Sequence, residues 1–158
     1  MLISKDQCKN LDYFKNKKAM STEKKNRLAA STVEDLKILS FLCQDAIVSR
    51  EEFFFDKKKN LFIATFSRFC WEKQENKHNQ NLNYRVVSGL QIKSVEKITY
   101  KNFKSNIPFL NLLAVSYNNK NITLNFSMSV EIILYCNKID VLLEDIDIPW
   151  PTKLKPKH

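Results

Sequence analysis

The spacing of apolar residues first predicts a helix. Between residues 33 and 44 apolar side chains recur at steps of three and four residues, as on the buried face of an amphipathic helix. These positions are Val33, Leu36, Leu39, Leu42 and Cys43. Ser31 and Glu34 have the S-x-x-E spacing of a capping box, which satisfies free amide groups where a helix begins. We therefore predict a helix over residues 33–44.

After Asp45 the apolar period becomes two, which predicts strands. Residues 61–69 alternate, and both of their faces are apolar at first, so this strand should lie in the middle of a sheet. Short apolar runs at 47–48 and 53–55 precede it. Further strands are predicted at 84–90, 93–100, 109–117, 121–126 and 131–136. The polar segment 73–83 has no period and should be a surface loop.

A second helix is predicted over residues 137–145, where Ile139, Leu142 and Leu143 have helical spacing and Asn137 can cap. This acidic helix and the Trp150 that follows it could form a docking element for a partner, or the segment could fold Trp150 back onto the domain as a cap. About seven strands between two helices predict an α+β fold with a mainly antiparallel, curled sheet. A pleckstrin-homology-like barrel has this element count, and a two-layer α+β sandwich is the alternative.

Charge is uneven along the 158 residues, whose formal net charge is +9. Residues 1–27 carry a net +5 and residues 151–158 a net +3, which leaves +1 for residues 28–150. We expect a flexible Lys- and Asn-rich extension over 1–27, one globular domain over 28–150 and a basic tail over 151–158. Nucleic-acid binding is not favoured, because it needs basic groups clustered on one face.

The residues that common catalytic and metal sites require are scarce or dispersed. A single glycine excludes Gly-rich phosphate loops. The four cysteines lack metal-site spacing, and His78 and His158 stand beside no plausible nucleophile, so no metal or cofactor is predicted. No apolar run is long enough to span a membrane, and no signal peptide is evident. We expect a cytoplasmic protein with reduced thiols.

The most informative polar stretch is the end of the 61–69 strand. Strand alternation would place Arg68 and Glu72 on one face and Trp71 on the other. Arg68 and Glu72 could pair structurally or orient a ligand together. Further candidate binding residues are Arg85 on a nearby strand, Asp45 at the helix end and Trp150 between two prolines.

The chain resembles a bacterial family of unknown function, DUF2948, from about residue 27 to residue 156. The resemblance is carried by segments at 33–36, 44–48, 66–72, 112–115 and 132–136, by Ile139, Leu143 and Asp145, and by Trp150 and Thr152. The resemblance implies a soluble bacterial protein, and it implies no activity, because the family has no known function. The family pattern has aspartate in place of Cys70 and a glycine-rich turn in place of residues 127–129.

Three functions are compatible with these features. The first is a non-catalytic module that binds another protein near Arg68, Trp71 and Trp150. The second is a small-ligand-binding protein or an enzyme that uses a polar cluster of Arg68, Glu72 and Arg85, with Asp45. The third is weak nucleic-acid binding through the Lys-rich tails. The Phe run 53–55 next to Lys57–Lys59 could also stack on the bases of a single strand.

Overall fold

The computed structural model describes residues 25–75 and 83–157 of the chain. The expectations for most of the N-terminal extension, for most of the 73–83 loop and for His78 and His158 concern residues outside these ranges. Within the described part, no helix is long and apolar enough to cross a membrane.

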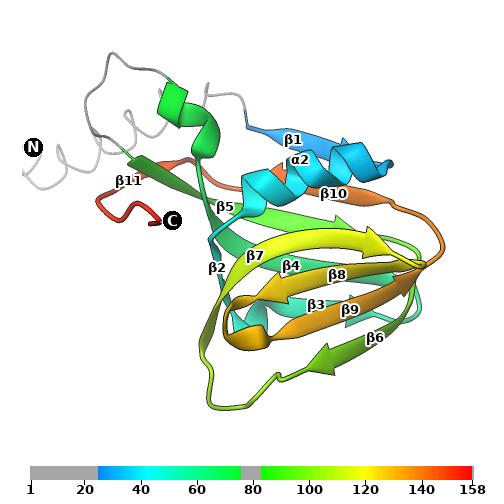
Figure 1. The fold of residues 1–158 in the computed structure, drawn as a ribbon. Helices are drawn as coiled ribbons and strands as arrows, with labels where there is room; N and C mark the ends of the chain where they lie inside the picture. Colours follow the sequence, from blue (N-terminus) through cyan, green and yellow to red (C-terminus); the bar gives the residue numbers. More distant parts are fainter. Residues whose placement is uncertain (1–24, 76–82, 158) are drawn as a thin grey trace, which may run out of the picture.

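One antiparallel sheet of eleven strands dominates the fold (Figure 1). Its strands are β1 (Arg27–Ala30), β2 (Ala46–Ser49), β3 (Phe53–Asp56), β4 (Leu61–Phe69), β5 (Asn83–Ile92), β6 (Val95–Lys101), β7 (Phe109–Asn118), β8 (Asn121–Phe126), β9 (Glu131–Cys136), β10 (Val141–Asp145) and β11 (Trp150–Thr152). The described residues also form the helix α2 (Val33–Cys43) and the 3-10 turns η1 (Arg50–Glu52), η2 (Trp71–Glu75) and η3 (Ser127–Ser129).

The predicted α+β fold with a mainly antiparallel sheet is confirmed, but the number of strands is wrong. The hydrogen-bonded order is β1-β10-β5-β4-β2-β7-β8-β9-β6, with β3 paired to β4 and β11 paired to β5. The order is open, with β1 and β6 at its two ends. Strands such as β1, β2 and β11 have only three or four residues, too few to show a period of two in the sequence.

Helix α2 forms where the apolar spacing predicts it, but its first turn differs by one residue. Thr32, rather than Ser31, is the N-cap, and its hydroxyl accepts a hydrogen bond from the Asp35 amide. The Asp35 carboxylate accepts from the Thr32 amide in return, which completes the capping box. Leu36 and Leu39 are buried, whereas Val33 is exposed because it stands in the first turn.

The predicted C-terminal helix is wrong: its second half is the strand β10. Val141 and Leu143 are buried in alternation, together with Asp145. β10 pairs with β1 on one side and with β5 on the other. The segment forms a strand despite its helical spacing, because β1 and β5 supply hydrogen-bond partners for the backbone N–H and C=O groups on both sides of β10.

The sheet bends around its core, so that β7, β8 and β9 lie in front of β3 and β4 in Figure 1. Phe62 and Leu90 from one part of the sheet share the core with Leu124 and Ile132 from the other. Helix α2 packs on β7 and β1 and contributes Leu36, Leu39 and Cys43 to the same core. β4 lies between β5 on one side and β2 and β3 on the other, which confirms its predicted place in the middle of the sheet.

Candidate functional site

Arg68 lies near the end of β4 and points into the core, where its exposed fraction is 1%. It is the largest of the fully buried side chains. A buried guanidinium is costly unless carboxylates and other acceptors surround it. The local structure therefore has to supply those partners.

Asp145, at the end of β10, is the main partner of Arg68. Its Oδ1 accepts from Arg68 Nε at 2.9 Å and its Oδ2 accepts from Arg68 Nη2 at 2.8 Å, a two-point pair. The Ser88 hydroxyl of β5 donates to Oδ1 at 2.6 Å. Burial alone raises the pKa of Asp145, but the hydrogen bonds from Arg68 and Ser88 outweigh burial and lower it below its usual value.

Glu72 is the second carboxylate bound to Arg68. β4 ends at Phe69, and the turn η2 brings Glu72 back over the guanidinium, which differs from the placement on one strand face that alternation predicted. Its oxygens accept from Nη1 at 3.0 Å and from Nη2 at 2.7 Å. Asn26 donates its side-chain amide to Glu72 at 2.8 Å, and its carbonyl accepts from the Asp145 amide.

All five N–H groups of Arg68 have acceptors, since the remaining Nη1 hydrogen bond goes to the Phe69 carbonyl at 3.4 Å. Burial alone would lower the pKa of Arg68, but its hydrogen bonds to Asp145 and Glu72 raise it above the usual range. The guanidinium is therefore permanently charged and has no donor left for a ligand. Through Asp145 and Glu72, it connects the end of β4 to the end of β10, to Ser88 in the middle of β5 and to Asn26, the residue before β1.

Arg85 and Asp45 meet on the other face of the sheet. Arg85 Nη1 donates to the Ser67 carbonyl at 3.0 Å and, at 3.4 Å, to the carbonyl of Asp45. Asp45 has a positive φ of 60°, which turns the chain from α2 into β2. Burial lowers the pKa of Arg85, and the charge of Asp45 opposes that effect. Arg85 therefore does not share the carboxylates of Arg68.

Three aromatic rings, those of Phe41, Trp71 and Phe69, form a continuous row beside Arg85. The Phe41 and Trp71 ring centroids lie 6.3 Å apart, and those of Trp71 and Phe69 lie 4.6 Å apart. Arg85 lies 5.9 Å from the centre of the Phe69 ring and pairs in register with Trp150 of β11. We call Phe41, Trp71, Phe69, Arg85 and Trp150 the aromatic row. Trp71 is fixed within it, because its indole N–H donates to the Gln44 carbonyl at 3.1 Å.

The candidate residues thus fall into two groups. Arg68 and Glu72 belong to the buried charge cluster, whereas Trp71, Arg85 and Trp150 belong to the aromatic row, which Asp45 touches through its carbonyl. Two of the cavities, with volumes of about 440 and 420 Å³, are lined by described residues, and none of the six candidates lines either of these two. Within residues 25–75 and 83–157, no three His, Cys, Asp or Glu side chains are placed to hold a metal ion.

Three buried cysteines, Cys43, Cys70 and Cys136, are free thiols. Burial raises the pKa of Cys43 to about 12 and that of Cys70 to about 11, although the charge of Arg68 opposes the rise at both. A thiol with such a pKa carries almost no nucleophilic thiolate at neutral pH. Cys70 is a buried core residue.

Sequence reasoning missed Asp145, Ser88 and Phe41 as members of these clusters. Asp145 had a usable signal, because it continues the alternation of Val141 and Leu143 and an inward carboxylate on a strand requires a cation. Ser88 gave no signal. Phe41 stands on the exposed side of α2, where the helical pattern alone does not explain an aromatic residue.

Comparison with models of known families finds a match over residues 26–158 to the family described as "Protein of unknown function (DUF2948)". No curated protein matches the chain. No solved structure matches it either. In η3, Met128 and Ser129 have φ values of 60° and 57°, a conformation that favours glycine.

Proposed function

The chain belongs to the DUF2948 family, whose function is unknown, and we propose that it is a non-catalytic module that binds another protein through the aromatic row. The observation that carries the proposal is the exposure of the two ends of the row. Phe41 is 58% exposed and Trp150 is 38% exposed, while Phe69 between them is fully buried. A ring that already packs against a neighbouring ring loses little side-chain conformational entropy when a partner binds. Aromatic residues also contribute much of the binding energy of protein interfaces.

The charge beside the row favours a basic partner surface. The cluster of Arg68, Glu72 and Asp145 has one more negative charge than positive, and Glu72 is its accessible member. A partner with an apolar side chain for the rings and a Lys or Arg for Glu72 would complement both features. We propose the cytoplasm as its location, which three free, buried thiols support.

The arrangement of Arg68 argues against the small-ligand and enzyme alternative. Its N–H groups are fully used within the protein, so a ligand carboxylate could bind it only by displacing Glu72 or Asp145. The proposed module therefore uses the charge cluster to hold strand ends in place, and the aromatic row to contact its partner.

Affinity capture with the tagged full-length chain tests this proposal. Phe41→Ala and Trp150→Ala should each lose a common set of captured proteins. Phe54→Ala is the matched control, because Phe54 is 60% exposed but lies on β3, outside the row. Purified candidate partners should then bind the wild type and the control with equal affinity.

Three results would contradict the proposal. The same proteins could remain bound to all variants, or the control could lose them as readily as the row variants. Sedimentation could instead show that the chain associates with itself through Phe41, in which case the partner is a second copy and not another protein.

A further inference from the structure

Seven exposed lysines belong to turns, or stand beside turns, at one end of the sheet. These turns lie at the right-hand side of Figure 1. We call this group the lysine end; its members are Lys57, Lys58, Lys59, Lys93, Lys97, Lys120 and Lys138. They come from the β3–β4, β5–β6 and β7–β8 turns, the start of β6 and the β9–β10 loop. Three carboxylates, Asp56, Glu96 and Asp140, share this end, so four positive charges are in excess.

Hydrogen bonds hold these turns together. The Val95 amide donates to the Asn60 carbonyl, and the Lys93 amide donates to the Asp140 carbonyl, both at 2.9 Å. The Cys136 amide donates to the Lys120 carbonyl at the same distance. The positions of the lysine backbones are therefore fixed before any ligand arrives, which lowers the entropic cost of binding.

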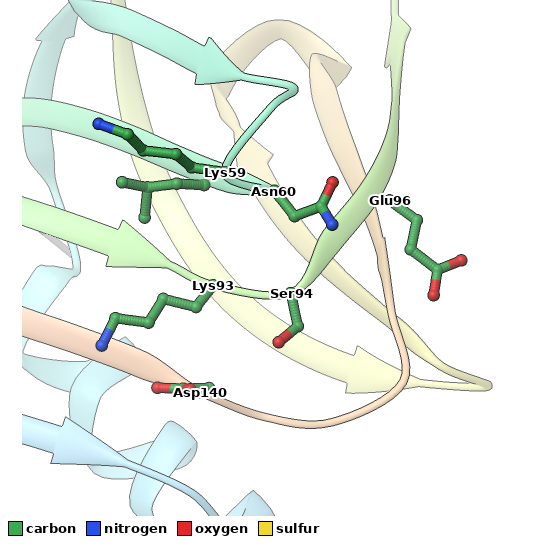
Figure 2. Close-up of a pocket in the computed structure, with 7 residues that line it drawn as sticks. Lys59, Asn60, Lys93, Ser94, Glu96 and Asp140 are labelled. Carbon is green, nitrogen blue, oxygen red and sulfur yellow. The ribbon is translucent and has the colours of Figure 1, made fainter.

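A pocket of about 440 Å³ opens between the turns of the lysine end. Figure 2 shows Lys59 and Lys93 on neighbouring segments, with both side chains extended to the left of the view, Lys59 upward and Lys93 downward. Lys59 has only a loose ion pair with Asp56, at 3.8 Å, and its side chain is 75% exposed. No ion pair engages Lys93 within the described part of the chain, so both ammonium groups are available to an anion.

The remaining polar groups of the pocket suit hydroxyl groups. Ser94 and Asn60 line it, together with the carboxylates of Glu96 and Asp140. Glu96 accepts from Asn137 at 2.7 Å, and Asp140 pairs with Lys138 at 3.7 Å, so each carboxylate has a partner and retains further acceptor positions. Phosphates would bind the two ammonium groups, while carboxylates would accept hydrogen bonds from hydroxyls.

We propose that this pocket binds a polyol that carries at least two phosphate groups, either a free sugar phosphate or the headgroup of an anionic lipid. The site is independent of the aromatic row, because β4 separates them: Leu61 lines the pocket and Phe69 belongs to the row. Nine strand residues span about 26 Å. Both sites could thus be occupied at once.

Calorimetry with the full-length chain and fructose bisphosphate tests the free-ligand form. Vesicle sedimentation tests the lipid form, with cardiolipin in phosphatidylcholine compared with phosphatidylserine at matched surface charge. Binding of the bisphosphate or a preference for cardiolipin supports the proposal and identifies the source. In either case the double variant Lys59→Gln/Lys93→Gln should bind at least about tenfold more weakly, because it removes both charge-assisted hydrogen bonds.

The double variant Lys57→Gln/Lys120→Gln is the matched control. It removes the same charge from the lysine end but leaves the pocket lining intact, so its affinity should fall by less than about threefold. Absence of both binding activities would overturn the proposal, as would equal losses in the two double variants. Equal affinity for pyrophosphate and fructose bisphosphate would also overturn it, since the polyol would then contribute nothing. So would an oligonucleotide that binds as tightly as the bisphosphate.

Discussion

Replacement of Arg68 with methionine should destabilise the fold by about 3–5 kcal/mol, because it leaves a buried carboxylate without its cation. Asp145 is 4% exposed and would lose two hydrogen bonds, at 2.8 and 2.9 Å. Glu72 can turn toward water, since a third of its side chain is exposed, so its loss is smaller. Methionine is flexible and fills most of the vacated space, which limits the cost of a cavity.

A second replacement distinguishes the charge effect from the packing effect. The double variant Arg68→Met/Asp145→Leu should be more stable than Arg68→Met alone, because no unpaired charge then remains in the core. Lys101→Met is the control for an exposed pair. Lys101 lies 3.1 Å from Glu131 but is 57% exposed, so its loss should cost less than about 1 kcal/mol.

Urea unfolding followed by far-ultraviolet circular dichroism measures these differences, provided that the slope m is the same in all variants. If Arg68→Met costs no more than Lys101→Met, the charge cluster does not stabilise the fold as described. The single variant Asp145→Leu completes the comparison. If the stability lost by Arg68→Met/Asp145→Leu equals the sum of the losses of Arg68→Met and Asp145→Leu, Arg68 and Asp145 act independently, which would also refute the reasoning.

Three further predictions follow from local geometry. The lowered pKa of Asp145 means that its ionised form stabilises the fold. This stabilisation is complete above the ordinary aspartate pKa of about 3.9 and is lost as the pH falls through the pKa of Asp145 in the folded protein. The free energy of unfolding should therefore fall less steeply with acid in Arg68→Met than in the wild type. An equally steep acid limb in both would contradict this. Thr32→Ala should cost about 1 kcal/mol in urea unfolding, because it removes the N-cap bond to Asp35, and an unchanged midpoint would show that the cap is dispensable. Cys43 and Cys70 should resist maleimide at neutral pH and react in urea, as read by mass spectrometry; rapid labelling of the native protein would contradict their burial.

Strong local patterns in the sequence were sufficient for part of the fold. Helix α2 has a full apolar stripe and a capping box, β8 alternates over its whole length and β9 is an apolar run after Glu131, so each was predicted within a residue or so. The segment 137–145 was predicted as a helix because its apolar spacing fits a period of 3.6 as well as one of two. Pairing with β1 and β5 decided between the two, and such pairing is not visible in a local window.

The candidate site was predictable only as a set of residues. The sequence pointed to Arg68, Glu72, Trp71 and Arg85 because Arg and Trp are conspicuous at a strand end. It could not assign Asp145 to Arg68, since 77 residues separate them and a predicted helix placed Asp145 elsewhere. The aromatic row was equally hidden, because it combines residues of α2, β4, η2, β5 and β11.

The distribution of charge along the chain can be seen in the sequence, whereas the clusters of charge in space can be seen only in the structure. The amino-acid sequence by itself determined the helix, the long strands, the scarcity of catalytic residue types and a nearly neutral body between two basic ends. The tertiary structure alone decided that lysines from separate turns meet at one end of the sheet, and that Arg68 is enclosed by two carboxylates at the other. Local patterns follow from the steric and hydrogen-bonding preferences of neighbouring residues, whereas these two clusters depend on strand register, which brings distant residues together.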